Sequence, residues 1–220
     1  MRRRKHNGRS YSHRRRSQIM KFDIAEFGFC KDKNEINLDN VLPINRRKMS
    51  NAAKFIYTSI SGFGNLDCPI VFATNFGEID RCIGLLSELS LSGLVSPTSF
   101  SLSVLNASVA SVAIQKQIHA PIFAISSSAP VEMATISAAS KLNQFDKICV
   151  ISYEESIHDK MQICAAFILK NGVSSELSIA KMPSLGNSLN STENFIKNIG
   201  KDFYFFDDEI CYKWKFNADF

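Results

Sequence analysis

The sequence lacks the cysteine patterns that hold metal ions or build disulfide frameworks. Its six cysteines are scattered along 220 residues, none forms a Cys-x-x-Cys pair, and none has a nearby histidine at metal-ligand spacing. Several lie in apolar runs, which is typical of small buried thiols in a reducing compartment. We therefore expect a cytoplasmic protein without a structural metal, a disulfide or a cofactor.

Long apolar runs are also missing. No stretch approaches the roughly 20 apolar residues that cross a bilayer, and no apolar segment follows the basic N-terminus as it would in a secretory signal. With 220 residues, of which 45% are hydrophobic, the chain can build one domain around one sizeable core. We expect that domain to cover residues 20–220, with no membrane span.

Acidic residues are absent from positions 1–19, which hold eight Arg or Lys residues and leave 18 basic against 21 acidic residues in the rest of the chain. Three interpretations remain open for this tail: a disordered arm that touches nucleic-acid phosphates, an Arg-rich presequence, or an upstream start before a native Met20. We favour the last, because Met20 opens the first predicted strand. Since the body is acidic, nucleic acid is not the expected partner.

Two catalytic patterns are missing as well. There is no Gly-x-Ser-x-Gly elbow, and the segment around Gly77 lacks the further glycines of a phosphate-binding loop. The serines at 126–128 could act as nucleophiles with His119 or His158 as base, and His158 with its flanking acids could bind a metal. We interpret the serines as helix-capping residues, His119 as a loop residue and His158 as solvated surface.

Strand and helix patterns alternate along the chain, which predicts an α/β fold. The predicted sheet is mostly parallel and is finished by antiparallel strands. Strands are predicted at residues 22–29, 69–74, 121–126, 147–153, 161–169 and 176–181, the last two joined by a hairpin turn at 171–172. Helices are predicted at residues 50–60, 78–91, 101–118, 131–142 and 194–199. The aromatic segment 203–220 is predicted to be an edge strand or a packing tail.

Four segments carry a family resemblance. They are the basic turn Leu42-Pro43…Arg46-Arg47-Lys48-Met49-Ser50, the strand and Gly-Glu at 71–78, the stretch Ser-Pro-Thr-Ser-Phe-Ser-Leu-Ser-Val-Leu-Asn-Ala at 96–107, and the strand-turn-helix at 121–139. These segments resemble the N-terminal half of the β-ketoacyl synthases, which have the thiolase fold. They resemble most a short ketosynthase-like branch from aryl-polyene and related fatty-acid-like pathways. The resemblance covers residues 42–154, and the stretch 96–107 is its most specific part.

The resemblance implies that the chain is catalytically silent. Asn106 matches a helix asparagine of full ketosynthases, and the ungapped alignment from it places their nucleophilic cysteine at Ala129. A cysteine there would be activated by the helix N-terminus, whereas alanine forms no thioester. The two assisting histidines of the family lie in a C-terminal half, and this sequence ends before such a half is complete.

The resemblance also implies a dimer seam. The segment with Phe100, Leu102, Leu105 and Asn106 would lie beside a partner's acyl tunnel and limit product length by its bulk; alternatively, these residues only pack the local core. A strand would pair across the dimer two-fold, and its residues are Ile122, Phe123, Ala124 and Ile125.

We therefore expect a chain length factor that forms a heterodimer with a complete β-ketoacyl synthase and meets acyl carrier protein only indirectly. Two rival hypotheses remain: acyl transfer or condensation through a residue other than cysteine, and nucleic-acid association through the basic tail.

Overall fold

The computed structural model describes residues 18–156, 160–187 and 189–217. Most of the basic tail, residues 1–17, and His158 lie outside the described residues, so the predictions on them are not tested. The first strand, β1, begins at Gln18, two residues before the predicted start of the domain at Met20; the boundary between tail and domain stays a prediction.

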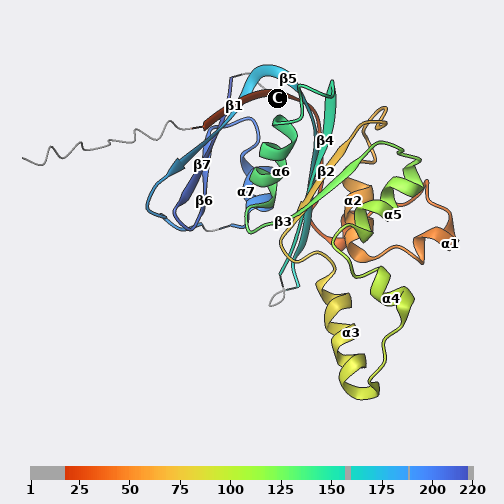
Figure 1. Cartoon of the computed structure of the whole chain (residues 1–220). Coiled ribbons are helices and arrows are strands. Elements are labelled where there is room, and N and C mark those ends of the chain that lie inside the picture. Colours follow the sequence, from red (N-terminus) through yellow and green to blue (C-terminus); the bar gives the residue numbers. More distant parts are fainter. Residues whose placement is uncertain (1–17, 157–159, 188, 218–220) are drawn as a thin grey trace, which may run out of the picture.

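A mixed sheet forms the centre of the molecule (Figure 1). Its strands follow the order β3-β2-β4-β5-β7-β6, and β1 pairs with β5 beside this path. The strands are β1 (Gln18–Cys30), β2 (Ile70–Thr74), β3 (Ile122–Ser126), β4 (Lys147–Glu155), β5 (Gln162–Lys181), β6 (Phe203–Asp207) and β7 (Ile210–Phe216).

The α/β class is confirmed, but the parallel part of the sheet is smaller than predicted. Among the described strands, the parallel pairs are β2–β3 and β2–β4, with β2 between the other two. The pairs β4–β5, β1–β5, β5–β7 and β6–β7 are antiparallel. The long strand β5 causes this difference, since three other strands pair with it in the antiparallel direction.

The predicted hairpin at residues 171–172 is wrong, because β5 is one strand of 20 residues. Its first half pairs with β4 up to Lys170, opposite Lys147. From Ser175, opposite Phe216, its second half pairs with β7. The Asn-Gly signal therefore marks the point where the strand changes partner.

Gly172 is needed for close approach and not for a turn. A Cβ atom on Gly172 would lie within 1.9 Å of the Asp23 side chain of β1. That carboxylate accepts a hydrogen bond from the Ser174 backbone N–H at 2.8 Å. The strand β1 shifts register between Phe22 and Asp23, so the Asp23 side chain occupies the space beside the glycine.

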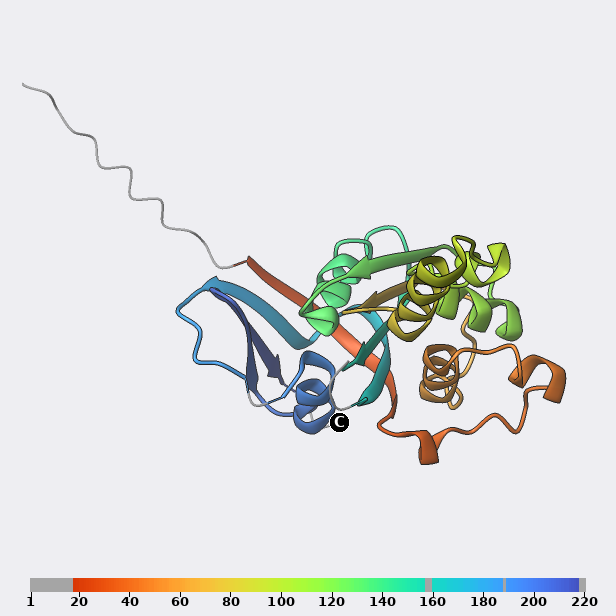
Figure 2. The ribbon, with the colours of Figure 1, turned by 90° about the horizontal axis from the view of Figure 1, so that it is seen from below.

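Helices cover both faces of the sheet, with a hydrophobic core under each set (Figures 1 and 2). One core includes residues of α6 and α7, and the other includes residues of α2 and α5. The α-helices are α1 (Pro43–Arg46), α2 (Asn51–Ser59), α3 (Ile79–Ser92), α4 (Pro97–Ser101), α5 (Ala107–Lys116), α6 (Pro130–Ala139) and α7 (Ser191–Asn198), with a 3-10 turn at Lys33–Glu35. As predicted, the Ser50 hydroxyl caps α2 by accepting from the Ala53 N–H at 3.1 Å.

The single helix predicted at 101–118 is wrong, because α4 and α5 are separate. The Ser96 hydroxyl accepts from the Ser99 N–H and starts α4. Ser103 ends it, since both its backbone N–H (3.0 Å) and its hydroxyl (2.8 Å) donate to the Phe100 carbonyl. The chain then turns and enters α5, where Val109 and Val112 are buried.

The C-terminal aromatic segment forms a hairpin of β6 and β7, with β6 at the edge of the sheet. Trp214 of β7 is fully buried, so this segment belongs to the core.

Candidate functional site

The turn between β3 and α6 is where the alignment places a nucleophile. Ala129 is the N-cap of α6, and its backbone N–H donates to the Ser127 hydroxyl at 3.0 Å. Pro130 follows at the first helical position, as the sequence predicts. Ala129 is fully buried in the core. The turn therefore points a methyl group into the protein; that this position corresponds to the family's nucleophile stays a prediction.

The neighbouring serines do not form a catalytic dyad with His119. The Ser126 hydroxyl donates to the Asn75 carbonyl, and the Ser128 hydroxyl donates to the Asp207 carboxylate at 2.8 Å. His119 precedes β3, while Ser126 ends the strand and the other two serines follow it, so the length of the strand, about 17 Å, separates them. These serines act in local capping and loop contacts.

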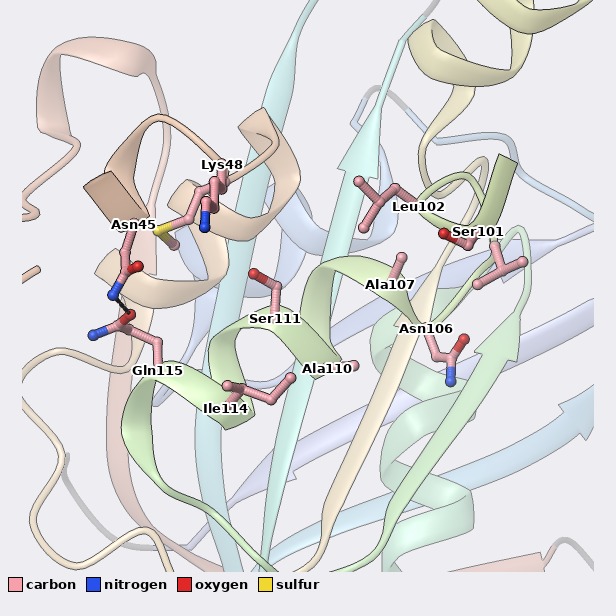
Figure 3. Close-up of a pocket in the computed structure, with 12 residues that line it drawn as sticks. Asn45, Lys48, Ser101, Leu102, Asn106, Ala107, Ala110, Ser111, Ile114 and Gln115 are labelled. Carbon is pink, nitrogen blue, oxygen red and sulfur yellow. Dashed lines mark hydrogen bonds between the residues drawn. The ribbon is translucent and has the colours of Figure 1, made fainter. Parts of the chain in front are cut away.

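A groove of about 490 Å³ opens beside α5 (Figure 3). Leu102 and Asn106 line it on the side of α4, and Lys48 and Asn45 line it on the side of α1. The Asn45 side-chain amide donates to the Gln115 side-chain oxygen at 2.8 Å and joins α1 to the C-terminal end of α5. Two residues predicted at the dimer seam thus meet in one apolar groove with a cationic rim.

The other two predicted seam residues lie outside this groove. Phe100 is 60% exposed, whereas Leu105 is half-buried and its side chain lies against Gly77. The sequence analysis missed the floor of the groove. The small residues Ala107, Ala110 and Ser111 of α5 form it, and their spacing along the helix is the signal in the sequence that could have indicated it.

The strand β3 is an edge strand among the described residues. Ile70 N–H donates to the Pro121 carbonyl, and Ser127 N–H donates to the Thr74 carbonyl, so odd-numbered residues of β3 face β2. Because a parallel strand alternates its hydrogen-bonding groups, the backbone groups of Ala124 point away from β2, and this residue is exposed. Ile122, Phe123 and Ile125 are half-buried.

The helix α3 leaves most of its apolar side chains uncovered. Only Leu85 is buried in this helix, while Leu86 is 66% exposed, Leu91 is 88% exposed and Leu94, just beyond its end, is 75% exposed. Figure 1 shows α3 and α4 projecting beyond the sheet. Such a concentration of exposed large apolar residues marks an interaction surface.

Two buried glutamates lie behind the Ala129 turn, and the sequence analysis missed both. Glu132 of α6 is fully buried, and it accepts from the Ser191 hydroxyl at 2.6 Å and from the Trp214 indole N–H at 3.1 Å. Glu154 of β4 accepts from the Thr192 N–H. Burial raises the pKa of both carboxyl groups, that of Glu154 to about 7.

We expect the stability of the protein to fall as pH rises from about 4.5 to 7 through Glu154. The folded protein holds a proton on this carboxyl that the unfolded chain releases near pH 4.5, so folding is favoured at low pH and the advantage is lost by pH 7. Urea unfolding of E154Q should show roughly 3 kcal/mol less of this pH dependence. Identical pH profiles for E154Q and the parent would contradict the assignment, and E193Q, at a partly exposed ion pair, is the control.

The described residues contain no cluster of three or more His, Cys, Asp or Glu side chains suited to a metal ion. Within the same ranges, no helix has the length and apolar character needed to cross a membrane.

Comparison with known proteins confirms the fold class. The family described as "Beta-ketoacyl synthase, N-terminal domain" matches residues 23–196. A ketosynthase in complex with its chain length factor from Xenorhabdus doucetiae superposes with a TM-score of 0.73 at 16% identity, over 89% of this chain and 99% of that one. The two matched chains are therefore similar in length.

Two further structures have the same fold at lower similarity. The ishigamide ketosynthase/chain length factor gives a TM-score of 0.56 at 11% identity, over 74% of this chain and 67% of that one. A β-ketoacyl synthase from Burkholderia phymatum STM815 gives 0.50 at 10% identity, over 66% of this chain and 50% of that one. No curated protein sequence matches this chain.

Proposed function

This chain belongs to the β-ketoacyl synthase N-terminal domain family, and we propose that it is the catalytically silent partner of a complete ketosynthase. In this role it is a chain length factor of cytoplasmic fatty-acid-like or aryl-polyene biosynthesis, and acyl carrier protein docks on the ketosynthase. The observation that carries the proposal is the edge of β3 that no described strand covers. The backbone groups of Ala124 point away from β2 at this edge. An unpaired edge is stable when another strand covers it.

The chemistry around the α6 turn supports silence. Ala129 offers no nucleophile at the start of α6, and the described cysteines other than Cys82 are buried. Burial raises the pKa of Cys30 and Cys164 to about 12. Burial also raises the pKa of Cys149 above that of a free thiol. These thiols stay protonated near neutral pH and are poor nucleophiles. Acyl transfer through these cysteines is therefore disfavoured. The rival hypothesis needs a nucleophile other than cysteine, and at the α6 turn the Ser126 and Ser128 hydroxyls donate to the Asn75 carbonyl and the Asp207 carboxylate.

The apolar surface of α3 and α4 supports a protein partner. A partner that pairs with β3 and also covers Leu86, Leu91 and Leu94 would remove apolar area from water, which stabilises the complex. Two of the similar solved structures are of ketosynthases with chain length factors, and the same kind of assembly fits these two features here.

Co-expression tests the pairing directly. The full chain, expressed with the complete ketosynthase encoded nearest to it, should purify as a one-to-one heterodimer, and light scattering gives the mass of that species. The lone chain should self-associate as its concentration is raised, because its edge strand and the apolar α3 surface stay exposed, and should be soluble when dilute. A stable lone monomer or homodimer that ignores the ketosynthase would overturn the proposal.

Product length tests the proposed tunnel wall. In the reconstituted complex, F100A and L102A should each lengthen the main acyl product by one or more two-carbon units, because both remove bulk from the segment beside the partner's tunnel. Mass spectrometry of the products measures the change. L185A, at an 82% exposed position far along the chain, is the matched control. Unchanged products from both variants would assign Phe100 and Leu102 to interface packing alone.

A further inference from the structure

A second, smaller pocket lies on the other side of Met49 from the α5 groove. Its volume is about 220 Å³, and its walls come from the first residues of α2, the first residues of α3 and the strands β4 and β5. Its lining includes the side chains of Glu78, Arg81, Glu155 and Gln162. Glu155 ends the parallel strand β4, and the carboxyl ends of parallel strands are where α/β proteins bind ligands.

The pocket is lined by more negative than positive charge. Glu78 and Glu155 are 8% and 5% exposed, and the exposed Asp80 adds a third carboxyl group. Arg81 is the cationic residue in this lining, and its Nε lies 3.7 Å from Glu78, too far for a hydrogen bond. Burial raises the pKa of Glu78; the Ser50 hydroxyl and the Arg81 charge lower it in part, and the nearby Glu155 carboxylate raises it. Glu78 therefore has one cationic partner, whereas Glu155 has none among the described residues, and a buried carboxylate without a counter-charge favours the entry of a cation.

The carboxylate oxygens are held in place by neutral donors. The Ser50 hydroxyl donates to Glu78 at 2.5 Å, while the Ile79 N–H and the Tyr153 hydroxyl donate to the two oxygens of Glu155 at 3.0 and 2.8 Å. Glu155 Oε2 also accepts from the Gln162 amide, whereas Glu155 Oε1 and Glu78 Oε1 each accept one of these bonds and keep further lone-pair capacity. The site is therefore rigid and can still accept additional N–H donors.

Gln162 contributes an acceptor that has no partner among the described residues. The residue is 8% exposed, and its Oε1 is buried without a hydrogen bond. Its amide nitrogen donates to Glu155 at 3.3 Å, which fixes the orientation, because a flipped amide would set its oxygen against the carboxylate. A buried acceptor without a donor is costly and is usually met by water or a ligand.

We propose that this pocket binds an ammonium or guanidinium group, which donates to Gln162 Oε1 and pairs with the Glu155 carboxylate, as Arg81 pairs with Glu78. Charge-assisted N–H donors satisfy both needs at once. A divalent metal fits less well: three carboxyl groups line the pocket, but the described residues hold no group of three or more metal-ligating side chains placed to share one ion. The cation is either a free small amine or the end of a basic side chain from a partner protein. The chemistry of the pocket is independent of the proposed pairing with a ketosynthase.

Melting curves of the purified full chain with methylammonium or tetramethylammonium chloride at equal ionic strength test this proposal, because only methylammonium carries N–H donors. We expect methylammonium to raise the melting temperature saturably, by about 3 °C, and tetramethylammonium to have no such effect. Q162L should abolish the response, while Q144L, at an exposed glutamine outside the pocket, should keep it.

Equal responses to the two salts, or an undiminished response in Q162L, would overturn the proposal as a general salt effect. If Q162L does not fold, the comparison of the two salts on the parent chain still decides. Repeating the titration on the complex with a ketosynthase distinguishes the sources of the cation. A response lost only in the complex would support the proposal with a basic side chain of the partner in the pocket, and a retained response would support it with a free amine.

Discussion

A124P should abolish the heterodimer while leaving this chain folded. The Ala124 N–H faces the free edge of β3, away from β2, so proline removes a donor that only a partner strand would use. Its ring also blocks a strand from approaching that edge. We expect the affinity for the ketosynthase to fall by at least about 100-fold, since a continuous ladder would lose a central hydrogen bond and its neighbours.

The measurement is the dissociation constant of the purified pair, together with circular dichroism and urea unfolding of the isolated variant. A124V is the matched control, because it fills the same exposed position and keeps the N–H. F123P serves as a second reference: residue 123 faces β2, so proline there should destabilise the fold itself. If A124P binds the ketosynthase as tightly as A124V, β3 is not the shared strand.

Local signals along the chain predicted those parts of the fold that depend on local chemistry. The Ser50 cap and the Pro130 helix start lie beside the helices they begin, so a reader of the sequence sees both partners of each contact. The Asn-Gly pair at 171–172 gave a wrong prediction, because the contact that decides its conformation is distant in the sequence. Whether it makes a turn or a bend in one strand depends on Asp23, which lies far away in the sequence.

The candidate sites show the same limit. The sequence marked Leu102 and Asn106, which do line the groove, but it could not show that Lys48 forms the opposite side. The hydrogen bond between Trp214 and Glu132 joins residues 82 positions apart. No periodicity or motif signals such a contact, because it arises when the sheet brings the C-terminal hairpin next to α6.

Trp214 stacks in the aromatic part of the core. Its ring lies 5.8 Å from Phe203 at an interplanar angle of 13°, and its centroid is 4.9 Å from that of Phe195. Its indole N–H is one of two donors that satisfy the buried Glu132 carboxyl. Glu132 lies three residues after Ala129, so this contact anchors the first turn of α6 and the turn before it to the hairpin.

Removing the indole of Trp214 should therefore be the most destabilising single change considered for this protein. W214A creates a cavity and strips a donor from a buried acid, and we expect a loss of about 5 kcal/mol in the free energy of unfolding, much of the stability of a domain. W214F keeps most of the ring contacts and loses the N–H, so its cost should be near 2 kcal/mol. Urea unfolding measures both values, with Y204A, at a half-exposed tyrosine of β6, as the control.

A further substitution separates the two causes. If the cost of W214F comes from the donor missing at Glu132, adding E132M should recover part of it, because the buried acid and its unmet acceptor are then removed together. Additive losses in the double variant would show instead that ring packing alone accounts for the effect of Trp214. In that case the C-terminal hairpin would stabilise the core without positioning the turn at Ala129, and the link between the hairpin and the α6 turn would be lost.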